Sequence, residues 1–158
     1  MAAKVFVDTN VLVYSRDTSE PPKQAQAMVW MRHLWHTRTG RLSYQVLQEF
    51  YITVTEKLDP GLDRESARKD IRSLLPWRPI AVENRVIDGA WHIQDRFGLS
   101  WWDALIVSAA QVSGCHYLLT EDLQDGQAIG NLQIINPFQT TPETCLWLHL
   151  TPPAPQRG

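Results

Sequence analysis

The sequence predicts a single α/β domain built around a mainly parallel β-sheet. Its 158 residues, 44% of them hydrophobic, are enough to bury one core. Short apolar runs alternate along the chain with longer segments of helical periodicity, the pattern of strands joined by crossover helices. Two of these runs lead directly into acidic residues, and a parallel sheet binds its ligands beyond the carboxyl ends of its strands.

The first half of the chain is expected to form one strand and three helices. Val5–Val7 is a β-branched and aromatic run that ends at Asp8. Proline in the first turn, Ser43 and Asp63 are suitable starts for the helices that follow. The expected segments are a strand at 5–7 and helices over about 21–38, 43–58 and from 63, the last with Arg64, Arg68 and Arg72 on one face.

The second half is expected to add a helix pair and further strands. A helix that begins at Ser100 is almost entirely apolar up to Gly114, so it is expected to be buried. The other expected segments are strands at 80–82, 115–119 and 132–135 and a helix over 84–97. We therefore assign residues 1–138 to the domain and residues 139–158 to an extension or loose tail, with an appended strand candidate at 145–150.

Charge is unevenly distributed along the chain. Fifteen Lys and Arg against seventeen Asp and Glu give a formal charge of −2, so no overall basic field attracts a polyanion. Residues 97–156 contain no Lys or Arg but five acids, Asp103, Glu121, Asp122, Asp125 and Glu143. If several of these converge, solvent, protonation or a bound cation must relieve their repulsion.

Several common classes of protein are excluded by missing signatures. The chain has no phosphate-binding Gly-rich loop with Lys, no Gly-x-Ser-x-Gly elbow, no His-Glu-x-x-His helix and no Cys-x-x-Cys pair. Its two cysteines lack the spacing of a metal site or a disulfide scaffold. No signal-peptide core or membrane-spanning run is evident, so a cytoplasmic protein without membrane contact is expected.

Carboxylates are the remaining candidates for chemistry. They occur at four separate places: Asp8 after the first strand, Glu49 within a helix, Asp103 in the first turn of the buried helix, and Asp122 with Asp125 after a later strand. Oxygen-only ligands suit hard cations such as Mg²⁺ or Mn²⁺, which are often held together with substrate phosphate groups. The sequence therefore favours a phosphoryl substrate.

Each acid also has a structural explanation. Asp103 completes a capping box with Ser100, and Glu49 alone is an ordinary helix residue. Asp8, Thr9 and Asn10 are typical of a strand-to-helix turn. The acids that precede Gly126 are typical of a loop. The conjunction of the four places is what favours function.

At that conjunction the sequence resembles the PIN-domain nucleases, in particular the VapC-type toxin ribonucleases of bacterial toxin–antitoxin pairs. The matching parts span roughly residues 4–138. They are VFVDTN at 5–10, Glu49, SWWDALIVSAA at 100–110, YLLTED at 117–122 and INPF at 135–138. Their order and spacing are much more specific than any one motif.

The resemblance implies a three-layer α/β/α fold and a Mg²⁺- or Mn²⁺-dependent endoribonuclease. Asp8, Glu49, Asp103 and Asp122 would be the catalytic and metal-binding acids, with Asp125 as a supporting ligand. Thr9, Asn10 and Thr120 would hold carboxylates or ordered waters in place. The resemblance also implies an antitoxin partner and a homodimer.

RNA affinity would need local basic groups, because the net charge is negative. The candidates are Arg16, Lys23, Arg38, Arg41 and the face formed by Arg64, Arg68 and Arg72. Two other functions stay open. One is a catalytically silent PIN-like module that binds a cation or RNA. The other is a domain phosphorylated on Asp8, although Asn10 breaks the Asp-x-Asp pattern of such phosphatases.

Overall fold

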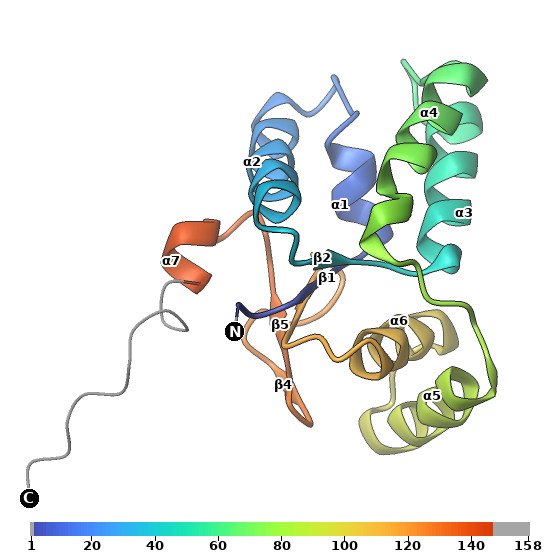
Figure 1. The fold of residues 1–158 in the computed structure, drawn as a ribbon, viewed down its shortest axis with the longest axis vertical. Coiled ribbons are helices and arrows are strands. Elements are labelled where there is room, and N and C mark those ends of the chain that lie inside the picture. Colours follow the sequence, from blue (N-terminus) through green and yellow to red (C-terminus); the bar gives the residue numbers. More distant parts are fainter. Residues whose placement is uncertain (1, 147–158) are drawn as a thin grey trace, which may run out of the picture.

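The structure, a computed structural model, describes residues 2–146 and contains a five-stranded sheet flanked by helices (Figure 1). The strands are β1 (Val5–Val7), β2 (Gly40–Arg41), β3 (Tyr117–Leu119), β4 (Ala128–Ile129) and β5 (Leu132–Ile135). The helices are α1 (Thr9–Tyr14), α2 (Pro21–Thr37), α3 (Tyr44–Ile52), α4 (Arg64–Leu74), α5 (Asn84–Phe97), α6 (Trp101–Val112) and α7 (Pro142–Leu146). A π-helical turn, Thr53–Lys57, follows α3, and a 3₁₀ turn, Leu75–Trp77, follows α4.

The sheet is mainly parallel, with strand order β2-β1-β3-β5-β4. β1 pairs in parallel with β2 and β3, and β3 with β5, whereas the short β4 runs antiparallel to β5. In Figure 1, α2 and α7 lie on one side of the sheet and α5 and α6 on the other. The predicted α/β fold of three layers with a mainly parallel sheet is confirmed.

The pairing of β1 with β3 places the polar residues that follow these strands side by side. Val7 is in register with Leu119, and the Asp8 N–H donates to the Leu119 carbonyl across 3.1 Å. Thr120 is anchored in turn, because its N–H donates to the Ile135 carbonyl of β5 across 3.0 Å. Asp8 and Thr120 therefore meet at the carboxyl edge of the sheet.

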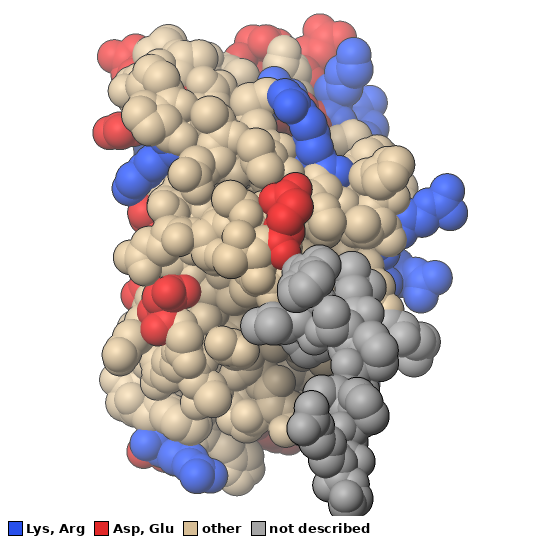
Figure 2. Space-filling view, turned by 90° about the vertical axis from the view of Figure 1, so that its left-hand side faces the viewer, with Lys and Arg blue, Asp and Glu red and all other residues tan. Residues whose placement is uncertain are grey.

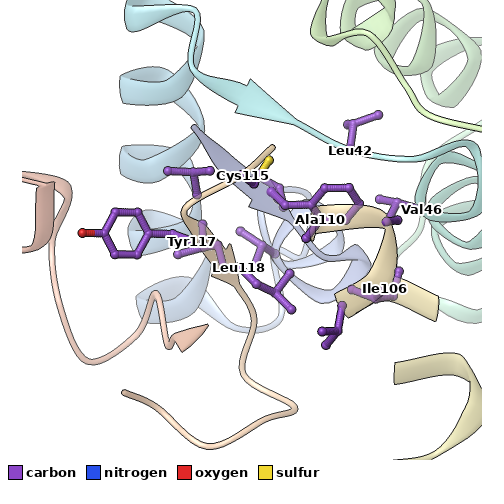
Figure 3. Packing of buried hydrophobic residues seen from close by; sticks show 14 of the residues in the cluster. Leu42, Val46, Ile106, Ala110, Cys115, Tyr117 and Leu118 are labelled. Atoms are coloured by element: carbon purple, nitrogen blue, oxygen red, sulfur yellow. The ribbon is translucent and has the colours of Figure 1, made fainter. Parts of the chain in front are cut away.

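The core lies between the sheet and its helices, and Figure 3 shows side chains of β3, α3 and α6 packed together there. All three residues of β1 are fully buried, and every residue of α6 from Ala104 to Ala110 is buried as well, with none more than 4% exposed. The prediction of a buried helix after Ser100 is confirmed. No helix within residues 2–146 has both the length and the hydrophobicity needed to cross a membrane.

Helices α5 and α6 approach each other unusually closely at one point. The Ser108 hydroxyl donates to the Val86 carbonyl across 2.6 Å, which ties the two helices together. Gly89 faces the same hydroxyl, and a Cβ placed on Gly89 would lie 2.5 Å from Ser108 Oγ. The next atom of that neighbour, Ser108 Cβ, would lie at 3.5 Å, an ordinary contact.

The structure differs from the sequence-based expectations in four places. The helix expected to reach Leu58 ends at Ile52 and continues as the π-helical turn, and the strand expected at 80–82 is a single bridge between Ile80 and Ser43. β2, β4 and α1 were not expected as separate elements. Within the expected extension, α7 occupies 142–146, and the remainder of the strand candidate at 145–150 lies outside the described residues.

The close contact between Gly89 and Ser108 predicts that the effect of Gly89→Ala on stability depends on which residue occupies position 108. Gly89→Ala is expected to lower the free energy of unfolding by about 1–3 kcal/mol, because the added methyl meets a buried hydroxyl. In a Ser108→Ala background the same change is expected to be neutral or stabilising, since Ala is the better helix former by about 1 kcal/mol. A double-mutant cycle in urea measures both, and equal effects in the two backgrounds would contradict the packing.

Candidate active site at the carboxyl edge of the sheet

Asp8 is the most enclosed acid of the site. It directly follows β1 and is the N-cap of α1, where its Oδ1 accepts the Thr9 N–H across 2.7 Å. The residue is only 6% exposed. A carboxylate in such a place needs hydrogen bonds at both oxygens, because burial without partners is costly.

The second oxygen of Asp8 is held by a network that reaches another acid. Its Oδ2 accepts the Thr120 hydroxyl across 2.9 Å and the Asn10 amide across 3.3 Å. The same Asn10 Nδ2 lies 3.0 Å from Thr120 Oγ1 and 3.1 Å from Asp122 Oδ2. The Asp122 N–H also donates to Thr120 Oγ1 across 3.1 Å. Asn10 and Thr120 thus link Asp8 to Asp122.

Glu49 joins the site from α3, whose first turn is fixed because Ser43 Oγ accepts the Val46 N–H. The Thr9 hydroxyl donates to Glu49 Oε2 across 2.8 Å, and the Gln45 amide donates to Oε1 across 3.1 Å. Gln45 is a site residue that the sequence analysis missed. Its position four residues before Glu49 on one helix face was the available signal.

Asp103 approaches from the first turn of α6. Ser100 caps this helix by accepting the Asp103 N–H across 3.2 Å, so one half of the predicted capping box is present. The charge of Asp103 acts on Asp122 and raises its pKa. Asp103 is half-buried, and within the described residues its carboxylate has no recorded ion pair.

Burial, together with repulsion between the carboxylates, disfavours the ionised form of Asp8 and Asp122. Burial raises the pKa of Asp8 to about 7, and the charges of Asp122 and Glu49 act in the same direction. Hydrogen bonds from Thr9 and Thr120 oppose that rise but do not cancel it. Burial also raises the pKa of Asp122, against the lowering effect of the Asn10 hydrogen bond. The site therefore resists full ionisation in the absence of a cation.

The other two acids of the loop after β3 have different contacts. Glu121 forms an ion pair with Lys23 at 2.9 Å, and that ammonium also lies over the rings of Tyr14 and Phe138. Asp125 accepts the Asn136 N–H across 2.8 Å, which closes the loop onto the segment after β5. The structure thus links Asp122 to Asp8 through Asn10 and Thr120 and gives Asp125 a contact elsewhere.

The donor set suits a hard divalent cation. In residues 2–146 no three His, Cys, Asp or Glu side chains converge tightly enough to be recognised as a metal-binding group. The four acids nevertheless offer only oxygen donors, and the ion pairs of this part of the chain, Arg16–Asp70, Lys23–Glu121 and Arg85–Glu83, involve none of them. Uncompensated carboxylates beside a buried one fit Mg²⁺ or Mn²⁺.

Comparisons with known proteins bear on the family. The family model of the PIN domain matches residues 5–124. No match is found among curated proteins. PIN domains are generally nucleases, and they typically depend on a divalent metal ion.

Solved structures with similar folds are distant in sequence. A toxin–antitoxin complex from Klebsiella pneumoniae aligns with a TM-score of 0.60 and 15% identity, over 85% of this chain and 98% of that chain. VapBC2 from Rickettsia felis, bound to a DNA fragment from its promoter, aligns with a TM-score of 0.55 and 17% identity, over 82% of this chain and 96% of that chain. PAE2754 from Pyrobaculum aerophilum aligns with a TM-score of 0.51 and 20% identity, over 77% of this chain and 83% of that chain. At these identities the likeness is one of fold.

The family match includes β1, α3, α6 and the loop after β3, the elements that carry all four acids. It also spans well over half of the chain, so the protein belongs to the PIN-domain family.

Proposed function

We propose that the protein is a Mg²⁺- or Mn²⁺-dependent endoribonuclease and the toxin of a VapBC-type toxin–antitoxin pair. The observation that supports this best is the set of four acids from separate elements, two of them linked through Asn10, with no cationic side chain paired to any of them in the described residues. Membership of a nuclease family agrees with that arrangement.

In this proposal Asp8, Asp103, Glu49 and Asp122 hold the metal ion. Bound there, the ion supplies Lewis acidity at the scissile phosphate and lowers the pKa of a water molecule. Asn10 and Thr120 keep the carboxylates of Asp8 and Asp122 at a constant separation. Thr9 and Gln45 donate to the two oxygens of Glu49 and so hold its carboxylate in place.

The toxin assignment draws on the nature of the similar structures. Two of them are described as toxin–antitoxin assemblies, one from Klebsiella pneumoniae and one from Rickettsia felis. We infer by analogy that this chain also has an antitoxin protein as its partner and acts as a homodimer on RNA.

The nuclease proposal is tested by cleavage of a mixed pool of structured and single-stranded RNA. Cleavage is expected with Mg²⁺ or Mn²⁺ and not with EDTA. Asp8→Asn and Asp103→Asn are each expected to lower the rate by more than about 100-fold, since losing even an outer partner of a metal site commonly costs 10–100-fold.

The matched control is Asp88→Asn, which removes one exposed carboxylate from α5 and should cleave like the native protein. Metal-dependent cleavage that survives in both site variants would rule out the proposed centre. Binding of RNA without cleavage under any metal would favour the silent binding module instead.

The identity of the fourth acid is tested by comparing two neighbours. Asp122→Asn is expected to lower cleavage by more than about tenfold, because this carboxylate is linked to Asp8. Asp125→Asn should cause a much smaller loss, because its amide oxygen still accepts the Asn136 N–H. The reverse order of effects in parallel rate measurements would move the fourth position to Asp125.

The burial of Asp8 predicts an unusual pH dependence of stability. Its pKa is about 7 in the folded protein against the ordinary 3.8, so the folded state keeps a proton that the unfolded state releases. In metal-free buffer this group's stabilising contribution is present below about pH 4 and is lost as the pH rises through 7. At pH 8 Asp8→Asn is therefore expected to exceed the native protein in unfolding free energy, by up to about 4 kcal/mol.

Urea unfolding at pH 5 and pH 8, with and without Mn²⁺, measures this effect. The advantage of Asp8→Asn should be larger at pH 8, and Mn²⁺ should stabilise the native protein but not the variant. A variant that is less stable than the native protein at both pH values would show that the carboxylate is not under electrostatic stress.

A further inference from the structure

A pocket lies away from the four acids, at the end of the sheet where the parallel strands begin. It has a volume of about 450 Å³ and is lined by Trp35, Arg38, Arg41, Pro76, Trp77 and Arg78. Three of these six residues are arginines, and no acidic residue of the described chain lines the pocket. We call it the arginine–tryptophan pocket.

The arginines of this pocket are available for an anion. Arg41 donates from Nη1 to the carbonyls of Gly40 and Arg38, at 2.7 and 3.2 Å, which holds its guanidinium in place. Arg38 and Arg78 are exposed, and neither belongs to an ion pair recorded for residues 2–146. By contrast, Arg16 and Lys23, two other candidates for RNA contact, are paired with Asp70 and Glu121.

The backbone places both exposed arginines at the ends of helical segments. Arg38 ends α2 with a φ of 60°, and Arg78 ends the 3₁₀ turn with a φ of 55°. They are the non-glycine residues with positive φ in the described chain, and both line the pocket. Glycine adopts this conformation at lower cost, and residues kept in it cluster at functional sites.

Two indole rings form the apolar part of the pocket. Trp77 is 3% exposed, and its ring packs so tightly on Gly40 that a Cβ there would lie 2.6 Å from it. Trp35 is 50% exposed, with its ring centroid 6.2 Å from that of Trp77. A buried ring thus lies beside an exposed one, and both line the same pocket as the guanidinium groups.

The position of the pocket separates it from the acids. Arg38 precedes β2, the outermost strand of the sheet, which runs parallel to β1. Asp8, by contrast, follows β1. The pocket therefore lies at the amino edge of the sheet and the acids at its carboxyl edge. On the face in Figure 2, several Lys and Arg side chains lie along the right-hand margin and others lie near the left-hand margin, with acidic side chains among them.

We propose that the arginine–tryptophan pocket binds a nucleotide of single-stranded RNA, with Arg38 and Arg78 on its phosphates and Trp35 stacked on its base. Guanidinium groups match phosphate oxygens, and an exposed indole accepts any base. An acidic peptide would use the arginines but would not need the half-exposed ring. The choice of RNA rests on the proposed ribonuclease function, and the pocket then holds RNA at a distance from the acids.

The test measures binding without cleavage. Fluorescence anisotropy of a labelled single-stranded RNA is recorded in EDTA with Asp8→Asn protein as the parent. Adding Arg38→Gly and Arg78→Gly is expected to weaken binding at least about tenfold and to reduce the slope of log Kd against log salt by about 1.4. Adding Trp35→Leu instead should weaken binding about tenfold at an unchanged salt slope.

Misfolding is controlled by the choice of glycine, which relieves the positive φ, so the melting temperature of the double variant should equal or exceed that of the parent. Lys57→Gln with Arg96→Gln removes the same charge from exposed positions outside the pocket, neither in an ion pair recorded for residues 2–146, and should change Kd less than threefold.

Equal affinity of the pocket variants and the charge control would overturn the proposal. It would also be overturned if the variants kept RNA affinity but lost binding to a glutamate-rich peptide, since the pocket would then serve a protein. Absence of RNA cleavage by the native protein would refute the proposed activity and leave this binding result standing.

Discussion

The burial of the Asp8 carboxylate is the constraint around which the site is built. A carboxylate that is 6% exposed needs donors at both oxygens, and each donor comes from a neighbour in the fold. Thr9 and Asn10 follow it in α1, and Thr120 reaches it because β1 and β3 are paired in register. A shift of one residue in that pairing would remove Thr120 from Asp8 and would separate Asp8 from Asp122.

The same burial makes the site unfavourable when it is fully ionised. Burial raises the pKa of Asp8 and of Asp122, the charges of the neighbouring acids add to that rise, and no lysine or arginine of the described chain pairs with either carboxylate. In the proposed function, a divalent cation bound among these acids would relieve that cost and stabilise the folded state. Lys23 contacts the same loop after β3, but it is paired with Glu121 and therefore does not neutralise Asp8 or Asp122.

The elements with strong periodicity or clear caps were predictable. Of the acids singled out in the sequence, the structure brings Asp8, Glu49 and Asp122 into one hydrogen-bond network through Thr9 and Asn10. β1, α2, α5, α6 and the strands at 117–119 and 132–135 were expected from their patterns. β2 and β4 were not, because two residues carry no periodicity, and the 80–82 strand was wrong because Ile80 forms only a bridge with Ser43. Whether Asp122 or Asp125 faces Asp8 depends on loop closure by the Asn136 N–H, a contact that the composition of the loop does not encode.

The uneven charge of the chain acquires a spatial meaning in the fold. Residues 97–156 contain acids but no Lys or Arg, and they supply Asp103 and Asp122 to the carboxyl edge of the sheet. Arg38, Arg41 and Arg78 come from the first part of the chain and line the pocket at β2, the outermost strand of the sheet, which includes Arg41 itself. Basic groups close to the acids would compete with a metal ion for the carboxylates. In the proposed function, attraction for a polyanion at one end of the strands and a cation held by acids at the other would let a protein of charge −2 bind both.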